Sequence, residues 1–249
     1  MDTYKTKEIA ALTGVHPNTV RFYEDVGFIT PPKRLPNGYR VFTKLHLRQM
    51  ELVRVALRAE VLQNGLRKKA VEVIRFCAAL DFEHAAGSAR EYEAMLEREA
   101  ENAKAAVASV ESMLNSSAGT DTSLNRKKAA EKLNITVDTL RNWELNGLIT
   151  VRRTQNGYRV YNSTDLERLN IIRTLRCANY SLSAILRLLN RLDAGLIAPV
   201  EEILNTPEEG EDIVSVCDRL AVSLENTQKD TERMIAILNE MKARYSTIQ

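Results

Sequence analysis

Two arginines in matching surroundings carry the side chain best suited to hold a polyanion. Arg21 lies in the stretch Thr19-Val20-Arg21-Phe22-Tyr23-Glu24, and Arg141 lies in Thr139-Leu140-Arg141-Asn142-Trp143-Glu144. A guanidinium group can donate two parallel hydrogen bonds to guanine O6 and N7, or it can hold a phosphate. An ordinary surface salt bridge is the alternative for each arginine. We expect both arginines to contact nucleic acid.

The neighbours of each arginine can add to such a contact. Thr19 and Thr139 can cap a helix or donate a hydrogen bond to phosphate, and the Tyr23 hydroxyl can reach the same phosphates. Trp143 replaces Tyr23 in the second stretch and has a single N–H donor, so the same role is weaker there. The alternative for these aromatic side chains is a place in the core.

A second basic motif also occurs twice. Asn37-Gly38-Tyr39-Arg40-Val41-Phe42 returns as Asn156-Gly157-Tyr158-Arg159-Val160-Tyr161. We expect Arg40 and Arg159 to meet phosphate, and the tyrosine beside each to brace the motif or join the contact. Phosphate contacts of this kind give affinity and position but little choice of sequence. Solvated arginines are the alternative.

The two pairs of motifs indicate that a whole module is duplicated. The offset is 120 residues for the first motif and 119 for the second. A period this long exceeds that of solenoid repeats. The chain has 249 residues, which leaves room for about two domains.

Each module should begin with a helix-turn-helix. In the first module we expect a helix over residues 6–13, with Thr6 as its N-cap and with Ile9, Ala10 and Leu12 facing inward. A turn at Gly14 leads to a second helix, which His16-Pro17-Asn18 opens and Gly27 closes. The same frame predicts helices over 126–133 and 137–146 in the second module, the latter closed by Gly147.

A β-hairpin, or wing, should follow each helix pair. The expected strands are 28–29 with 39–42, and 148–151 with 158–161. Asn-Gly supplies the positive φ angles of each tight turn. The connections between these strands carry Lys33, Arg34, Arg152 and Arg153. A helix-turn-helix followed by such a hairpin is a winged helix.

Helical spacing of apolar residues continues after each wing. It predicts helices over 44–59 and 66–80 in the first module, and over 164–177 and 182–190 in the second. Each module then ends in a long helix with a heptad seam, which is typical of a coiled coil. The first seam comprises Leu96, Ala100, Ala103, Val107, Val110 and Leu114. The second comprises Ile213, Cys217, Leu220, Leu224, Thr227, Thr231, Met234, Leu238, Met241, Tyr245 and Ile248.

Charge alternates along the chain in register with the modules. The net charge is +7 over residues 1–70, −6 over 71–121, +8 over 122–191 and −7 over 192–249. Basic modules suit a polyanion, and acidic segments suit solvated helices that stay away from it. Solvated helix faces alone are the alternative.

Composition narrows the class of protein further. Three cysteines without Cys-x-x-Cys spacing make a disulfide framework or zinc site improbable, and we expect Cys77 and Cys177 to be buried. The cysteine pattern fits a reducing interior. No apolar run has the length of a membrane span or of a signal peptide. No His/Cys/carboxylate constellation or phosphate-cradling glycine loop indicates an enzyme.

The repeated motifs resemble the DNA-binding domain of the MerR family of bacterial transcription regulators. Arg21-Phe22-Tyr23-Glu24 and Asn37-Gly38-Tyr39-Arg40 carry the resemblance in the first module, and Arg141 to Glu144 with Asn156 to Tyr161 carry it in the second. Tyr180-Ser181-Leu182-Ser183 is similar to the helix pair after the family's wing, whereas the first module has only a loose counterpart at 61–66. The resemblance implies pairing through an antiparallel coiled coil, and palindromic promoter sites that are distorted for RNA polymerase. Family members that sense metals carry cysteines that this chain lacks.

The expected fold is therefore mainly α. It comprises a winged helix-turn-helix over 1–80, a coiled-coil helix over 81–115, a linker over 116–124, a second winged helix-turn-helix over 125–192, and a connector with a coiled-coil helix over 193–249. We expect one chain to act as a pseudo-dimer on an imperfect palindrome, with the two long helices paired. A four-headed homodimer and an architectural, excisionase-like DNA bender remain alternatives.

The expected contacts with double-stranded DNA are His16, Asn18, Thr19, Arg21, Tyr23, Lys33, Arg34, Tyr39, Arg40, Thr139, Arg141, Trp143, Arg152, Arg153, Tyr158 and Arg159. We expect no catalytic residue, metal or cofactor, no membrane partner, and a cytoplasmic location on the bacterial nucleoid.

Overall fold

The computed structural model describes residues 3–58, 65–115, 123–195, 198–207 and 216–246, and these are mainly helical. The chain forms two compact units. The first comprises residues 1–98 and 223–249, and the second comprises residues 99–222. Each unit therefore contains one of the repeated modules.

The first unit begins with the expected helix pair, α1 (Thr6–Thr13) and α2 (Pro17–Asp25). The N-cap of α1 is Lys5 rather than Thr6, because the Glu8 carboxylate accepts a hydrogen bond from the Lys5 N–H at 2.7 Å. The expectation for Leu12 is also wrong, since this side chain is 59% exposed. The buried stripe instead runs through Ile9 and Ala10 to Thr13, which follows them by four and three residues.

The second unit repeats this pair as α6 (Arg126–Lys132) and α7 (Val137–Leu145). Asn125 caps α6 by accepting from the Lys128 N–H, and Thr136 caps α7 by accepting from the Thr139 N–H at 3.0 Å. Asn134, with a φ of 52°, makes the left-handed turn that Gly14 makes in the first unit. Asparagine is one of the few residues that tolerate this conformation.

The wings lie later in the chain than expected. The first pairs β2 (Lys33–Arg34) with β3 (Arg40–Thr43), and the second pairs β5 (Arg152–Arg153) with β6 (Arg159–Tyr161). The basic pairs thus form strands rather than connections, and 28–29 and 148–151 are not strands. The Phe28 N–H already bonds the Tyr23 carbonyl at 2.8 Å and the Leu148 N–H bonds that of Trp143 at 3.0 Å, so these residues close the preceding helix.

Each wing carries a third strand that the sequence analysis missed. β1 (Thr3–Tyr4) pairs with β3, and β4 (Leu124–Asn125) pairs with β6, which gives the orders β1-β3-β2 and β4-β6-β5. The expected linker over 116–124 is wrong at Leu124, which forms a strand. Residues 116–122 lie outside the described part of the chain.

The helices after each wing lie where the periodicity places them. The first unit has α3 (Lys44–Arg58) and α4 (Leu66–Ala78), and the second has α8 (Ser163–Cys177) and α9 (Leu182–Asp193). In the second unit α10 (Val200–Asn205) and a 3-10 turn (Val216–Arg219) follow. The buried Arg187 guanidinium donates to the carbonyls of Ile203, Leu204 and Asp218, so it ties this connector to α9.

The two long helices are α5 (Phe82–Asn115) and α11 (Leu220–Tyr245). Most of the predicted seam is buried in both, although Leu114 is 41% exposed. Ile213 and Ile248 lie outside the described residues, as does the side chain of Cys217.

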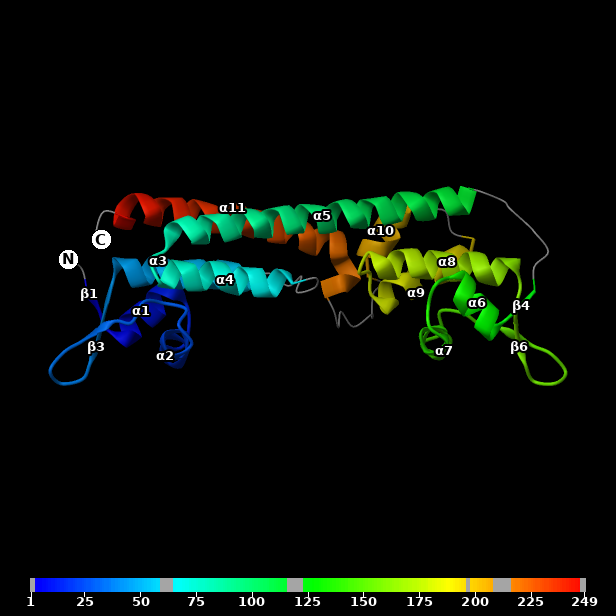
Figure 1. Cartoon of the computed structure of the whole chain (residues 1–249), viewed down its shortest axis with the longest axis horizontal. Helices are drawn as coiled ribbons and strands as arrows, with labels where there is room; N and C mark the ends of the chain where they lie inside the picture. Colours follow the sequence, from blue (N-terminus) through cyan, green and yellow to red (C-terminus); the bar gives the residue numbers. More distant parts are fainter. Residues whose placement is uncertain (1–2, 59–64, 116–122, 196–197, 208–215, 247–249) are drawn as a thin grey trace. The chain divides into compact units, whose positions relative to one another are not determined.

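In the first unit α11 lies against the helices of the N-terminal module (Figure 1). Glu240 pairs with Arg48 at 2.7 Å, and Asp230 pairs with Arg58 at 3.2 Å. Lys242 pairs with Glu83 of α5 at 2.6 Å. Since the residue number falls along α11 as it rises along α3, these two helices are antiparallel.

In the second unit the end of α5 lies against α8 and the loop after it. The Asn179 amide donates to the Glu99 carboxylate at 3.0 Å, and the Asn170 amide contacts the Met113 sulfur at 3.5 Å. Each unit therefore includes part of a long helix that follows the other unit's winged module in the sequence.

Candidate nucleic-acid interface

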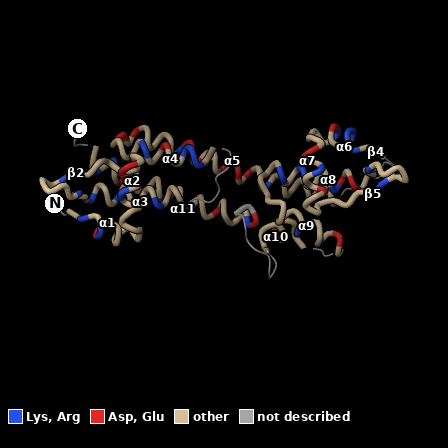
Figure 2. Tube along the Cα trace, turned by 90° about the horizontal axis from the view of Figure 1, so that it is seen from below, with Lys and Arg blue, Asp and Glu red and all other residues tan. Residues whose placement is uncertain are grey.

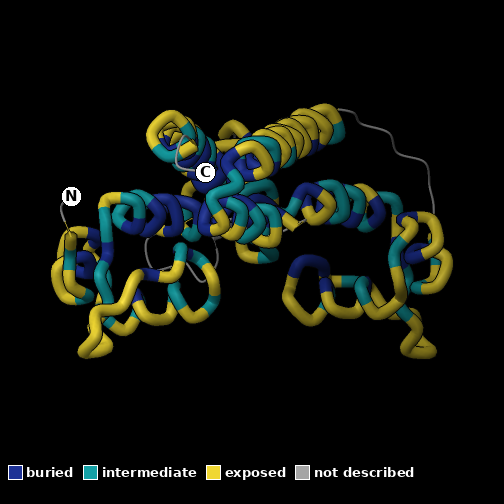
Figure 3. The backbone as a smooth tube through the Cα atoms, turned by 60° about the vertical axis from the view of Figure 1, so that its left-hand side comes forward, coloured by how far each residue is buried: buried dark blue, intermediate teal, exposed yellow. Residues whose placement is uncertain are grey.

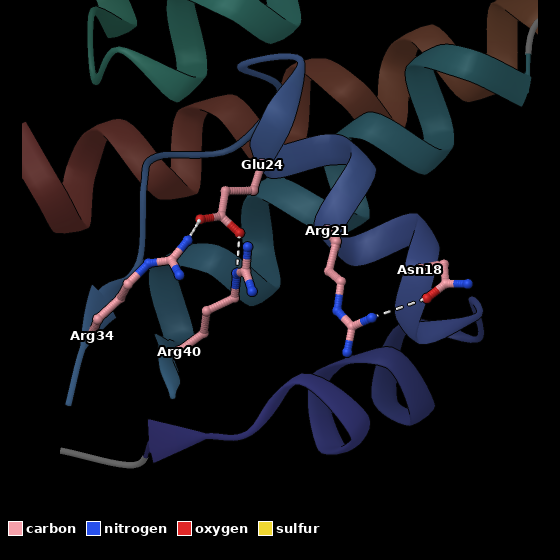
Figure 4. A network of polar contacts seen from close by, with 5 residues as sticks. All are labelled: Asn18, Arg21, Glu24, Arg34 and Arg40. Atoms are coloured by element: carbon pink, nitrogen blue, oxygen red, sulfur yellow. Dashed lines mark hydrogen bonds and ion pairs between the residues drawn. The ribbon is translucent and has the colours of Figure 1, made fainter. Parts of the chain in front are cut away.

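The second helix of each pair presents an exposed arginine. Arg21 is exposed, and its Nη1 donates to the Asn18 side-chain oxygen at 3.2 Å (Figure 4). Arg141 is exposed at the matching position of α7. Within the described ranges, neither arginine forms an ion pair with a carboxylate, so the salt-bridge alternative finds no partner there. Both guanidinium groups face solvent.

The residues that open these helices hold their N-termini in different ways. In α2 the His16 Nδ1 accepts from the Asn18 N–H at 3.2 Å. In α7 the hydroxyls of Thr136 and Thr139 lie 2.8 Å apart. His16 and Asn18 are exposed, whereas Thr19 and Thr139 are half-buried. The N-terminal turn of each helix thus combines exposed polar groups with backbone N–H groups, which attract anions.

Tyr23 and Trp143, the aromatic residues two positions after Arg21 and Arg141, belong mainly to the core. Trp143 is only 4% exposed, so its indole offers little surface to DNA. Tyr23 is half-buried against the core cluster that contains Ile9, Val20 and Phe42. Burial raises the pKa of the Tyr23 hydroxyl, which leaves it protonated and able to donate at neutral pH.

A glutamate that the sequence analysis did not select joins each helix to its wing. In the first unit Glu24 accepts from the Nε of Arg40, and its other oxygen pairs with Arg34 at 3.2 Å (Figure 4). In the second unit Glu144 pairs with the Nε of Arg159 at 2.6 Å. The signal was present in the sequence, because both modules keep a glutamate three residues after the arginine.

Glu144 has two further partners that Glu24 lacks. The Tyr161 hydroxyl donates to its carboxylate, and Arg126 of α6 pairs with it at 3.0 Å. Burial, and then the hydrogen bond to Glu144, raise the pKa of Tyr161 to about 12. We call Glu24, Arg34 and Arg40 the Glu24 cluster, and Glu144, Arg126, Arg159 and Tyr161 the Glu144 cluster.

The clusters divide the wing residues into two groups. The side chains of Arg40 and Arg159 are only 21% and 29% exposed, and a carboxylate already holds each of them. Tyr39 and Tyr158, near the wing tips, are 69% and 73% exposed. The basic pairs of β2 and β5 are also exposed. Figure 2 shows the basic residues at these strands, and Figure 3 shows where the backbone is exposed. Arg40 and Arg159 therefore position the wing, and the tip residues lie open to a ligand.

The second unit also has an open hollow beside α7. Its volume is about 640 Å³, and its lining includes Thr136, Asn142, Arg173 and Cys177. The exposure of Cys177 contradicts the expectation that it is buried, because it ends α8 on the solvent side. Cys77 is buried as expected, and burial raises the pKa of its thiol to about 12.

The described residues contain neither a metal-binding group nor a helix suited to a bilayer. No group of three or more His, Cys, Asp or Glu side chains among them lies close enough to hold a metal ion. None of the helices within these ranges is both long and apolar enough to cross a membrane.

The geometry in each unit is that of a winged helix-turn-helix, and the chain carries two of them. Comparison with known families agrees. Residues 5–42 match the family model described as MerR family regulatory protein, and residues 125–192 match that of the MerR HTH family regulatory protein. The chain therefore contains two MerR-type units. This family comprises transcription regulators rather than enzymes.

Curated relatives give the same result. The HTH-type transcriptional regulator CueR of Escherichia coli O6:H1 is 45% identical over 49 residues, which cover 20% of this chain and 36% of CueR. CueR of Yersinia pestis is 41% identical over 49 residues, or 20% and 35% of the two chains. YfmP of Bacillus subtilis is 34% identical over 53 residues, or 21% and 38%. The chain thus spans little more than a third of these relatives' length. No solved structure gives a significant match.

Proposed function

We propose that this protein is a sequence-specific regulator of transcription that binds double-stranded promoter DNA. The observation that carries the proposal is the exposed arginine on the second helix of each unit, beside a wing that a partly buried glutamate holds in place. A helix of this kind enters the major groove in helix-turn-helix proteins, and the wing meets the adjacent backbone. The relatives CueR and YfmP are HTH-type transcriptional regulators, which supports the same function.

The proposed contacts follow from exposure and charge. Arg21 and Arg141 contact bases or phosphates in the major groove, and the residues at the wing tips contact phosphates. The remaining proposed contacts are His16, Asn18, Thr19, Tyr23, Lys33, Arg34, Tyr39, Thr139, Arg152, Arg153 and Tyr158. Arg40 and Arg159 orient the wing through their glutamates and add positive charge to it. Trp143 supports α7 from the core.

A single chain is proposed to act as a pseudo-dimer. Support comes from the way the long helices are divided between the two units. Helix α11 packs on the N-terminal module, and the end of α5 belongs to the unit that contains the second module. Covalent connection makes such an exchange intramolecular and therefore favourable. The two modules differ in sequence, so their site is an imperfect palindrome. Distortion of that site would act on RNA polymerase through the DNA, in the cytoplasm of a bacterium.

Two alternatives share the same DNA-binding surface. An architectural, excisionase-like protein would bend DNA away from promoters, so mapping the site relative to a promoter separates it from a regulator. A four-headed homodimer would place two chains on DNA. Light scattering with a bound duplex distinguishes them, since one chain has a mass of 28.1 kDa.

The test of DNA binding is the double variant Arg21→Ala, Arg141→Ala. Each bidentate contact to a base contributes about 1–3 kcal/mol, so we expect the affinity for the selected duplex to fall at least about thirtyfold. Fluorescence anisotropy measures this, and circular dichroism checks the fold. The matched control is Arg75→Ala, Arg233→Ala, which removes two exposed arginines from α4 and α11. Equal affinity of the folded double variant and the control would overturn the site.

A further inference from the structure

The outward face of α2 and that of α7 carry different side chains in a repeated geometry. Val20 and Leu140 are fully buried, and the positions on the opposite side of each helix follow i, i+4, i+7 spacing. This outward stripe comprises Asn18, Phe22 and Asp25 in the first unit, and Asp138, Asn142 and Leu145 in the second. All six residues are exposed. The stripe is therefore the solvent-facing side of each helix.

The apolar position of the stripe differs between the units. Phe22 is 55% exposed and occupies the middle position, whereas Leu145 is 75% exposed and occupies the last. Asn142 of the second unit occupies the position of Phe22, and Asp25 of the first unit occupies the position of Leu145. The apolar residue is thus shifted by three residues along the helix, or about 4.5 Å at 1.5 Å per residue. This shift is close to one base-pair step of about 3.4 Å.

The two asparagines of the stripe each already have a side-chain partner close by in the sequence. The Asn18 side-chain oxygen accepts from Arg21 at 3.2 Å, and the Asn142 side-chain oxygen accepts from the Asn146 amide at 3.2 Å. Phe22 and Leu145 have no polar group to satisfy. In the major groove the apolar feature that such a side chain can meet is the C5-methyl group of thymine.

We infer that Phe22 and Leu145 each read a thymine methyl group, and that the thymine read by Leu145 lies about one base pair farther toward the C-terminal end of its helix than the one read by Phe22. This inference rests on the proposed DNA-binding function and adds which bases it selects. The carboxylate of Asp25 occupies the place of Leu145 in the first unit, where it disfavours the same contact. The asymmetry of the operator then follows from one exchange of side-chain type.

The experiment replaces single thymines by deoxyuridine, which removes only the methyl group. A duplex selected by the full chain from a random library supplies the operator. Each thymine is replaced in turn, and affinity is measured for the parent chain, Phe22→Ala and Leu145→Ala. Loss of one buried methyl contact corresponds to about 0.8 kcal/mol, so we expect about fourfold weaker binding at one thymine per half-site for the parent.

The variants assign each methyl group to its side chain. In Phe22→Ala the fourfold effect should vanish in one half-site only, and in Leu145→Ala it should vanish in the other. The double exchange Phe22→Asn, Asp25→Leu should move the methyl-dependent thymine of the first half-site by one step. Phe22, Asp25 and Leu145 are all exposed, so the circular dichroism spectra of these variants should match that of the parent chain.

The outcomes separate this inference from the proposed function. The parent chain could bind its operator tightly while neither Phe22→Ala nor Leu145→Ala abolishes the effect of removing a thymine methyl group. That result would overturn the inference and leave DNA binding intact. Methyl-dependent thymines at equivalent steps in both half-sites would also overturn it. A parent chain that selects no duplex would overturn the proposed function and the inference together.

Discussion

Glu24 and Glu144 occupy the same position in the two units, but they hold different groups. Glu24 binds two arginines of its own wing, Arg34 and Arg40. Glu144 binds one wing arginine, Arg159, together with Arg126 of α6 and the hydroxyl of Tyr161. The first cluster couples α2 to two strands of its wing, whereas the second couples α7 to one strand of its wing and to α6. Two copies of one sequence motif have therefore acquired different internal connections.

The difference between the clusters also changes how many wing arginines are free of a carboxylate partner and can contact a ligand. Arg34 is 53% exposed and is held by Glu24. Its counterpart Arg153 is exposed, and within the described residues it forms no ion pair. We expect the second wing to contribute more positive charge to a phosphate than the first.

The largest expected effect is on stability, from truncating the two glutamates. Glu144→Ala leaves Arg126 and Arg159 without a counter-charge and the buried Tyr161 hydroxyl without its acceptor. We expect the free energy of unfolding of the second unit to fall by about 2–3 kcal/mol, below the full cost of breaking a buried pair because both arginines are partly exposed. Trp143, the single tryptophan, reports this unit in urea denaturation followed by fluorescence.

Glu24→Ala should cost less, about 1 kcal/mol, because Arg34 can return to water. Calorimetry of both variants compares them directly, and Glu144→Gln, which keeps an acceptor for Tyr161, should recover part of the loss. A larger loss for Glu24→Ala than for Glu144→Ala would contradict the comparison.

A smaller effect is expected on DNA affinity. Arg153→Ala should weaken binding more than Arg34→Ala, since the first removes an arginine with no carboxylate partner. If each contact neutralises one phosphate, Arg153→Ala should lower the magnitude of the slope of log affinity against log salt by about 1. Arg34→Ala should lower it by less. Binding titrations between about 50 and 200 mM salt measure both slopes. Equal slopes for the two variants would show that Glu24 does not withhold Arg34.

The smallest effect concerns pH and the first unit alone. His46 is buried and its Nδ1 accepts from the Thr43 N–H at 3.0 Å, whereas Asp165 makes the matching contact in the second unit, to the Asn162 N–H at 2.9 Å. Burial lowers the pKa of His46, although Thr30 and Glu24 partly oppose the shift. The unfolded chain then binds the extra proton more readily than the folded one.

Stability from His46 is therefore complete above the unfolded pKa of about 6.5, and it is lost as the pH falls through that value toward the folded pKa. Thermal melts of the whole chain between pH 7.5 and 5.5 should show this loss. His46→Asn, which keeps an acceptor but does not titrate, should melt with less dependence on pH. An unchanged dependence in that variant would rule out His46 as the cause.

The helices of both modules could be predicted from the sequence because local signals specify them. Capping residues, glycines with positive φ and apolar spacing placed α1, α2, α7 and α8 within a residue or two of their observed ends. The wings were predicted with the wrong first strand. Helix closure and strand alternation compete for residues 28–29 and 148–151, and the backbone bonds of the closing turn decide between them.

The glutamate clusters could not be predicted from local patterns. Glu24 and Arg40 are 16 residues apart, and their pairing depends on how the wing folds back over α2. Strands β1 and β4 are two residues long, so alternation gives no signal for them. Trp143 could be assigned to the core only from its burial, because an aromatic side chain on this helix suits either role.

The packing of α11 on the N-terminal module has a consequence for biosynthesis. Residues 1–98 leave the ribosome more than a hundred residues before the segment that completes their unit has been made. At about 5–20 residues per second, that interval lasts several seconds. During it, the surface of α3 and α4 that later receives Glu240 and Met241 is uncovered. We expect chaperones to protect this uncovered surface of the nascent N-terminal module. We also expect premature termination near the 3′ end of the message to destabilise the module that is translated first.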